Sequence, residues 1–314
     1  MIITGDVDLM SKTVDGLKKV FNVKIQHNIQ DFLGCDIVEL PGEIQLYQKR
    51  IVAKILSESE FSNEKAYKTP SSPGFQAVRP QSNDEKVEMV TQKWCRATIG
   101  SLLYLVKLSR PDLANAVREL SKVMDGATTG QVKELRRLVS FLNKTKDKGL
   151  KMRFTHEEPW VIEAFSDSDF AGDREGRKSV TGVALTVCGV PISWKSKGQT
   201  TVSLSSTEAE YVALSEAVRE VKFVTQILDA IKIKYKKPID VFVDNIGAIF
   251  LAGNRNSSER SKHIDLKYHY VRQIIDDGLV DVKFVRSQAN LADLFTKNLG
   301  SEAYENHSSK LLAG

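Results

Sequence analysis

Ser205-Ser-Thr-Glu-Ala-Glu-Tyr211 stands where a strand-rich stretch of the sequence ends and a long helix begins. Ser205 and Glu208 form the capping pattern of a helix start, which leaves Glu210 free within the first turns. Beyond this stretch, apolar residues recur at the spacing of one helical face: Tyr211, Leu214, Val218, Val221 and Leu228. We expect that face to pack on a sheet, with Glu210 at its edge. A carboxylate turned towards a core needs a partner.

The sequence around this helix alternates between strand-like and helical segments. Five runs are strand-like: residues 161–166, 179–188, 190–195, 239–243 and 280–285. Four segments are expected to be helical: one from residue 207, then 246–253, 267–277 and 291–297, the last capped by Asn290. Three antiparallel strands followed by two that must join in parallel predict a mixed five-stranded α/β sheet.

Acidic residues stand at the ends of these predicted elements. Asp167 closes the first strand, Asp244 closes the fourth, and Asp293 lies near the start of the last helix. We expect these three carboxylates to meet Glu210. Hard oxygen ligands suit magnesium, so the sequence predicts a pair of Mg²⁺ ions, with Mn²⁺ as a substitute, held by the four acids.

Each of the four carboxylates also has a structural interpretation. Asp167 could bond to the backbone of its own turn, and Asp244 could cap the helix that follows its strand. Glu210 could be the third residue of a helix capped by Thr207, and Asp293 could interact with a helix dipole. All four structural roles would have to coincide in one fold order, so we favour the metal site.

The first half of the chain predicts a hairpin and several helices. Two β-type runs flank Pro41-Gly42. Helices are expected at residues 7–21, 48–56, 94–105, 113–124 and 130–143. Residues 57–88 are rich in Ser, Pro, Asn and charge, which indicates a linker or a long surface connection.

Composition limits the classes of protein that fit. The 314 residues carry a net charge of +5, which permits a polyanionic partner without requiring one. The three cysteines lack the spacing of a zinc site or a disulfide framework, which favours a reducing compartment. No apolar run approaches membrane-spanning length and the first residues do not form a signal peptide. We therefore expect a soluble, intracellular protein.

The order of elements in the second half resembles the ribonuclease H fold, and its sequence motifs resemble those of the copia-type retrotransposon version. The matching stretches, in order, are Ser166-Asp-Ser-Asp-Phe-Ala-Gly-Asp, Ser193-Trp-Lys-Ser-Lys, Ser205-Ser-Thr-Glu-Ala-Glu-Tyr, Val243-Asp-Asn, Arg260-Ser-Lys-His-Ile-Asp and Leu291-Ala-Asp-Leu-Phe-Thr-Lys. Six matches in the right order are far more specific than any one alone.

The first half resembles the segment after the polymerase active site of copia-type reverse transcriptases. Met1-Ile-Ile-Thr-Gly-Asp, Phe32-Leu-Gly-Cys-Asp-Ile and Ser109-Arg-Pro-Asp-Leu carry this resemblance. It implies an incomplete palm and thumb at 1–60, a linker and helical connection at 61–150, a ribonuclease H-like domain at 151–300 and a tail at 301–314. The family's Tyr-x-Asp-Asp motif is absent, so we expect no DNA polymerisation. We therefore expect the chain to be the truncated end of an open reading frame or a piece of a longer Pol polyprotein. An incomplete palm would also expose an unpaired strand edge near residues 1–4, which favours aggregation of the first half.

The resemblance implies hydrolysis of the RNA strand of RNA-DNA hybrids. Asp167 would bridge the two metal ions, and Glu210 and Asp244 would bind on opposite sides of it. Asp293 would complete the coordination of the second ion. A further set of residues is expected to bind nucleic acid: Lys195, Lys197, Arg255, Arg260, Lys262 and His263. Other Pol polypeptides are expected partners, in a cytoplasmic virus-like particle or the nucleus.

Two other functions fit parts of the sequence. A catalytically inert or domesticated fragment could bind hybrid or duplex through the helical connection, and the same four acids could serve a DNA nuclease. The loop Arg286-Ser-Gln-Ala-Asn also lacks the histidine that many cellular ribonuclease H enzymes have before the last helix, which predicts slow turnover. Trp194 is expected to be core rather than a stacking platform.

Overall fold

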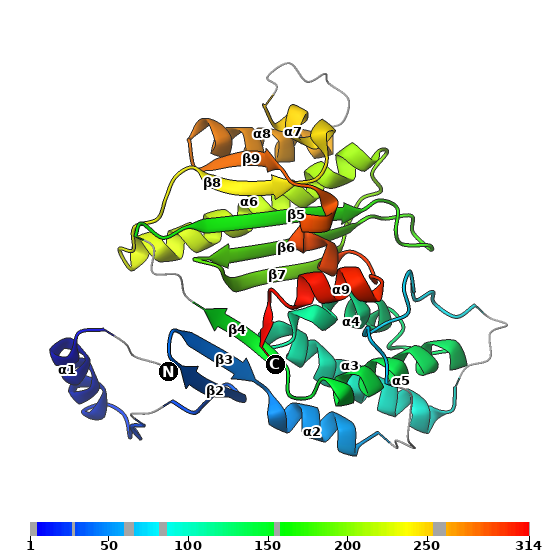
Figure 1. Cartoon of the computed structure of the whole chain (residues 1–314), viewed down its shortest axis with the longest axis horizontal. Coiled ribbons are helices and arrows are strands. Elements are labelled where there is room, and N and C mark those ends of the chain that lie inside the picture. Colours follow the sequence, from blue (N-terminus) through cyan, green and yellow to red (C-terminus); the bar gives the residue numbers. More distant parts are fainter. Residues whose placement is uncertain are drawn as a thin grey trace.

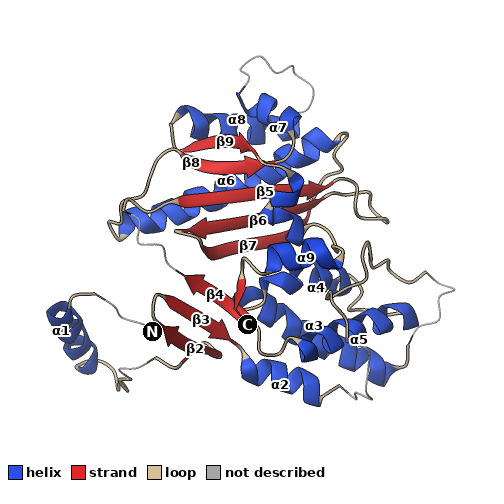
Figure 2. Ribbon diagram, viewed as in Figure 1, coloured by secondary structure: helices blue, strands red, loops and turns tan. Residues whose placement is uncertain are grey.

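The structure is a computed structural model that describes residues 5–26, 29–59, 66–81, 87–153, 158–253 and 262–313, apart from the side chains of residues 262–265. Within these ranges the strands form two five-stranded sheets, and helices pack between and around them (Figure 1). Figure 2 separates the helices from the strands by colour. No helix among the described residues is both long enough and apolar enough to cross a membrane.

The sheet predicted for the second half is present. Its strands are β5 (Ile162–Asp169), β6 (Val180–Val187), β7 (Val190–Gly198), β8 (Ile239–Val243) and β9 (Val280–Phe284). Their order in the sheet is β7-β6-β5-β8-β9. The pairs β5–β6 and β6–β7 are antiparallel, whereas β5–β8 and β8–β9 are parallel. The mixed five-stranded sheet expected from the sequence is therefore confirmed.

Two separate cores cover the two faces of this sheet. On one face lie α6 (Ser206–Ala230), α7 (Ile246–Gly253) and α8 (Lys262–Asp276), and the apolar stripe that begins at Tyr211 is buried there. On the other face lies the 3₁₀ helix η3 (Leu291–Phe295), which contacts β5, β6 and β7; the short η2 (Ser287–Ala289) precedes it, and helix α9 (Ser301–Ser308) packs against it. The core on this side joins η3 and α9 to the helices of the first half.

The first half forms the other sheet and a group of helices. Its helices are α1 (Val7–Lys18), α2 (Lys49–Ser57), α3 (Met89–Leu108), η1 (Pro111–Leu113), α4 (Ala114–Ser121) and α5 (Thr129–Lys144). The sheet runs in the order β1 (Asp31–Phe32), β2 (Cys35–Leu40), β3 (Glu43–Tyr47), β4 (Gly149–Arg153) and β10 (Leu312–Ala313). The hairpin at Pro41-Gly42 is confirmed, since Leu40 pairs with Glu43 across it.

Several elements differ from the sequence expectations. The strand β4 was not expected, and residues 301–313 form α9 and β10 where a tail was predicted. Because β10 pairs with β4, the end of the chain belongs to the first sheet. Helix α8 begins five residues before the predicted start at 267, and the last predicted helix is a 3₁₀ helix. The division into domains at residues 60, 150 and 300 stays a prediction. One hydrophobic core includes residues from both sides of these positions.

The Ser109-Arg-Pro-Asp-Leu stretch forms a buried ionic joint between helices. Arg110 donates two hydrogen bonds to Asp112, from Nε at 2.9 Å and from Nη2 at 2.8 Å. Its remaining donors reach the carbonyl oxygen and the hydroxyl of Thr145, each at 3.0 Å. The Tyr304 hydroxyl donates to Asp112 at 2.6 Å and so ties α9 to this joint. Arg110, Asp112 and Tyr304 are buried, so losing one of the two ions would leave the other charge unpaired in the interior.

Helix α1 makes no buried contact within the described residues. Asp6 caps it by accepting hydrogen bonds from the backbone of Asp8 at 3.0 Å and Leu9 at 3.1 Å. None of its side chains is buried, and Val7 and Leu9 are exposed. The strand expected at residues 1–4 lies outside the described residues.

Candidate active site

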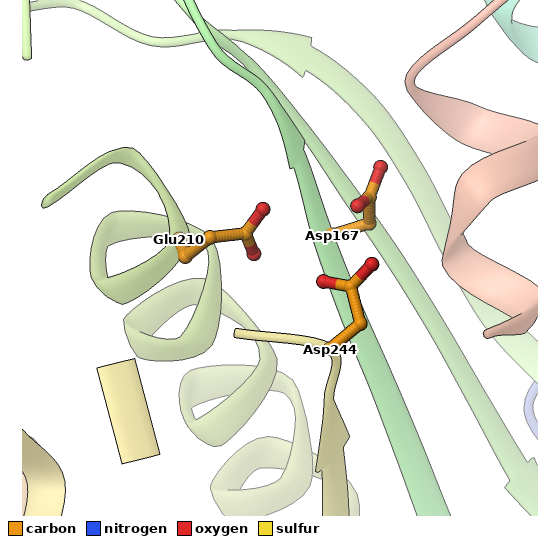
Figure 3. A group of neighbouring side chains, drawn as sticks. All are labelled: Asp167, Glu210 and Asp244. Carbon is orange, nitrogen blue, oxygen red and sulfur yellow. The ribbon is translucent and has the colours of Figure 1, made fainter. Parts of the chain in front are cut away.

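Three of the four predicted carboxylates converge at one edge of the second sheet. Asp167 lies near the end of β5, Glu210 in the second turn of α6, and Asp244 directly after β8. Each of the three offers a carboxylate oxygen, and these oxygens all lie within 4.8 Å of one another. Figure 3 shows the three side chains pointing towards a common space from a helix and two strand ends.

The strand register explains why two of these acids meet. In the parallel pairing of β5 with β8, Ser166 lies opposite Val243. The next residue on each strand is an aspartate, so Asp167 and Asp244 are neighbours at the same sheet edge. The Ser287 hydroxyl donates to Asp244 Oδ2 at 2.7 Å and holds that carboxylate from the loop after β9.

The start of α6 places the third acid. The Ser205 hydroxyl accepts a hydrogen bond from the Glu208 backbone at 3.1 Å, and the Glu208 carboxylate accepts one from the Leu204 backbone at 2.8 Å. The Ser205–Glu208 cap predicted from the sequence is therefore confirmed. Glu210, two residues on, turns towards the sheet edge, where its Oε1 accepts a hydrogen bond from the Ser168 backbone at 3.1 Å.

Burial and two neighbouring carboxylates oppose the ionisation of Glu210. Burial, and then the charges of Asp167 and Asp244, raise the pKa of Glu210 from 4.5 to about 8. Its second oxygen, Oε2, is buried and has no hydrogen-bond partner among the described residues. A carboxylate with an unpaired buried oxygen beside two other carboxylates is a ligand set that suits a hard divalent cation. The residues present therefore fit a magnesium-type ion.

Asp293, the fourth predicted acid, lies beside this group but is not one of the three. It belongs to η3, which Asn290 caps by accepting from the Ala292 backbone at 3.2 Å while donating to the Ser166 carbonyl at 2.9 Å. Burial and then Asp167 raise the pKa of Asp293 to about 7, although Lys297 opposes this change. The structure thus brings Asp293 close to Asp167.

Lys297 is a site residue that sequence reasoning missed. Its Nζ lies 3.4 Å from Asp167 Oδ2 and 3.4 Å from Asp293 Oδ1. Burial opposes the charge, but the two aspartates outweigh it and raise the pKa of the Lys297 ammonium. The neighbouring Thr296 hydroxyl also donates to Asp167 Oδ2. Two signals in the sequence could have found it: Lys297 ends the matching stretch Leu291-Ala-Asp-Leu-Phe-Thr-Lys, and it follows Asp293 at a spacing of four.

Gly182 allows η3 to approach the sheet this closely. A Cβ atom at this position would lie 2.6 Å from the Ala292 carbonyl oxygen and 3.2 Å from the Cβ of Phe295. Gly182 pairs with Asp167 across β5 and β6, so the bare backbone lies beside the site. Any side chain here would push η3, and with it Asp293, away from Asp167.

Two neighbouring acids, Asp173 and Asp169, lie outside the group of three. Asp173 accepts hydrogen bonds from Lys122 at 3.0 Å and from the Gly176 backbone at 2.8 Å. Asp169 follows Asp167 by two residues on β5, and burial raises its pKa. Trp194 packs against the first-half core and donates to the Val106 carbonyl at 2.8 Å, which confirms its structural interpretation.

Of the residues predicted to bind nucleic acid, the structure describes the side chains of Lys195 and Lys197. Lys195 Nζ lies 2.5 Å from Glu220 Oε1 and 4.0 Å from Glu216, so it is ion-paired to α6. Lys197 is exposed at the end of β7. Arg255 and Arg260 lie outside the described residues, as do the side chains of Lys262 and His263 at the start of α8.

A groove of about 610 Å³ runs between the helices of the first half and β7. Its walls include Leu103, Ile192 and Trp194, and its charged lining residues are Lys107, Arg118, Lys195 and Lys197. The β7 wall and Asp167 lie in one cross-strand row of the sheet. Ser196 on β7 pairs with Gly182 on β6, and Gly182 pairs with Asp167 on β5. With strands about 4.8 Å apart, the groove wall lies about 10 Å from Asp167.

The strand order β7-β6-β5-β8-β9, with acids on β5, on α6 and after β8, defines a ribonuclease H-like protein. No family model matches the chain. The Arabidopsis thaliana Pol polyproteins of transposons RE1 and RE2 are 31% and 33% identical to it, each over 99% of this chain and 21% of their own length. The Pol polyprotein of transposon TNT 1-94 from Nicotiana tabacum is 31% identical over 97% of this chain and 23% of its own length. The chain belongs to the retrovirus-related, copia-type Pol polyproteins, and it spans about one fifth of the length of these curated relatives.

Two solved structures show a weaker likeness. The compost-derived LC11-RNase H1 covers 46% of this chain and 96% of its own, with 14% identity and a TM-score of 0.32. A foamy viral protease-reverse transcriptase in complex with RNA/DNA hybrid covers 91% of this chain and 34% of its own, with 13% identity and a TM-score of 0.48. Because both TM-scores are below 0.5, the fold assignment rests on the strand order itself.

Proposed function

We propose that this chain hydrolyses the RNA strand of RNA-DNA hybrids at the carboxylate cluster. The observation that carries this proposal is the convergence of Asp167, Glu210 and Asp244 within 4.8 Å, with a buried Glu210 oxygen that has no partner among the described residues. Three acids from three separate elements at one sheet edge are poorly explained as turn or cap residues. Pol membership and the ribonuclease H-like strand order support the same reaction.

Asp167, Glu210 and Asp244 would hold a divalent cation, Mg²⁺ or Mn²⁺, with Asp293 as a fourth carboxylate beside them. Two such cations, when bound, would activate water and neutralise charge on the scissile phosphate and the leaving oxygen. The Ser168 backbone and the Ser287 hydroxyl fix the orientation of two of these ligands. This second layer of hydrogen bonds is the kind that keeps metal ligands in place.

We further propose that the groove beside β7 contacts the backbone of the substrate. Lys107, Arg118 and Lys197 line it, and its β7 wall stands in the same cross-strand row as Asp167. Contacts of this kind are independent of sequence and weaken with salt. A hybrid is the substrate we favour because 2′-hydroxyls exposed in a shallow minor groove mark the RNA strand. These 314 residues contain no Tyr-x-Asp-Asp sequence, so we propose that they do not polymerise DNA.

The test is cleavage of an end-labelled RNA-DNA hybrid by the full chain in Mg²⁺, beside an all-DNA duplex of the same sequence. We expect the RNA strand to be cut, the duplex to stay intact, and Asp167→Asn to abolish cutting. Asp281→Asn is the matched control, because this aspartate is exposed on β9 outside the site. Cutting of the duplex would support a DNA nuclease instead. Salt-sensitive binding without any cutting would support an inert nucleic-acid-binding protein.

A further inference from the structure

Lys297 contacts two of the four carboxylates of the site, Asp167 and Asp293. Asp167, Glu210 and Asp244 share one space, within 4.8 Å. The Lys297 ammonium lies 3.4 Å from Asp167, one of these three, and 3.4 Å from Asp293, which is not one of them. Asp167 therefore takes part in two groups, once with two acids and once with a cation that the chain itself supplies.

The position of Lys297 allows it to leave. Its side chain is 40% exposed, whereas those of Asp167 and Asp293 are 1% and 12% exposed. A lysine side chain has a long, flexible stem and can move its charge into solvent while the backbone stays in place. Thr296 holds Asp167 through its hydroxyl, and Gly182 lets η3 lie on the sheet, so neither support depends on the ammonium.

We propose that Lys297 is the counter-ion of the Asp167–Asp293 pair in the metal-free protein and competes there with a second divalent cation. The inference rests on the proposed metal-dependent function. A first cation held by Asp167, Glu210 and Asp244 leaves the Lys297–Asp293 contact in place. A second one, held by Asp167 and Asp293, requires the ammonium to withdraw. Lys297 would thus make the second ion bind more weakly than the first, although the same four carboxylates serve both ions.

The test is Mn²⁺ binding to the full chain without nucleic acid, followed by calorimetry and by the electron paramagnetic resonance signal of free Mn²⁺. Lys297→Met removes the charge and keeps most of the stem, and Lys297→Arg keeps the charge. Lys283→Met is the matched control, because Lys283 Nζ lies 2.7 Å from Asp240, is 46% exposed, and belongs to a surface ion pair on β9.

Because Asp167 belongs to both proposed sites, Lys297→Met should also bind the first Mn²⁺ more tightly, but by less than the second; Lys297→Arg and Lys283→Met should bind the first ion like the wild type. The second should bind at least about tenfold more tightly to Lys297→Met than to the other three, because a cation no longer opposes it at contact distance. Equal second-site affinity in all four, or no second ion in Lys297→Met, would overturn this inference alone. Binding that persists unchanged in Asp167→Asn, or no binding at all, would overturn the proposed metal centre and this inference with it.

Discussion

Replacing Glu210 with glutamine should stabilise the metal-free protein at neutral and alkaline pH. Burial, Asp167 and Asp244 raise the Glu210 pKa from 4.5 to about 8, so the folded state keeps a proton that the unfolded state releases. Between these two pH values the folded state binds more protons, and stability therefore falls as the pH rises. Above about pH 8 the loss is complete, whereas below pH 4.5 it is absent.

The size of this effect follows from the two pKa values. At about 1.4 kcal/mol per pKa unit, the change from 4.5 to about 8 corresponds to at most about 5 kcal/mol. The buried amide of the variant lacks a full set of partners, which costs about 1–3 kcal/mol. We therefore expect Glu210→Gln to gain about 2 kcal/mol at pH 8, or roughly 5 °C in Tm.

The assay is thermal unfolding in EDTA from pH 4.5 to 9, followed by circular dichroism. Glu302→Gln is the control, because Glu302 is exposed on α9 and should give nearly the wild-type Tm at every pH. Saturating Mg²⁺ should stabilise the wild type more than Glu210→Gln, since binding to the folded state raises stability. A variant less stable than wild type at pH 8 in EDTA, or a difference that does not change with pH, would refute the reasoning.

Two further substitutions test how the structure holds the site in place. Asp112→Ala leaves the buried Arg110 charge unpaired and should lower the free energy of unfolding in urea by about 3–5 kcal/mol. The control Asp125→Ala breaks an exposed ion pair and should lower it by under about 1 kcal/mol. Similar losses in the two variants would contradict the buried joint. Gly182→Ala should lower stability by about 1–3 kcal/mol and reduce hybrid cleavage, because the new Cβ collides with η3. Gly198→Ala is the control, since a Cβ there meets nothing within 4 Å. Equal activity of the two variants would count against the close approach of η3 to Gly182.

Much of the second sheet could be predicted because its signals are local. Strand-like runs end in Asp167 and Asp244, and helical spacing after Tyr211 turns Glu210 towards the sheet. The short strand β4 escaped prediction because Gly149–Arg153 mixes apolar and basic residues, and only pairing with β3 and β10 makes it a strand. Propensity is weak in a segment whose partners are distant in sequence.

The sequence by itself determined the order of strands and helices around the second sheet, the helix cap at Ser205 and the identity of the acids, because each depends on residues a few positions apart. Only the tertiary structure decided which charges meet. Lys297 reaches Asp167 because η3 lies against the bare backbone of Gly182. The groove beside β7 exists because helices more than 70 residues earlier in the chain pack along that strand. Charge and cavity depend on contacts between distant segments, which no local pattern encodes.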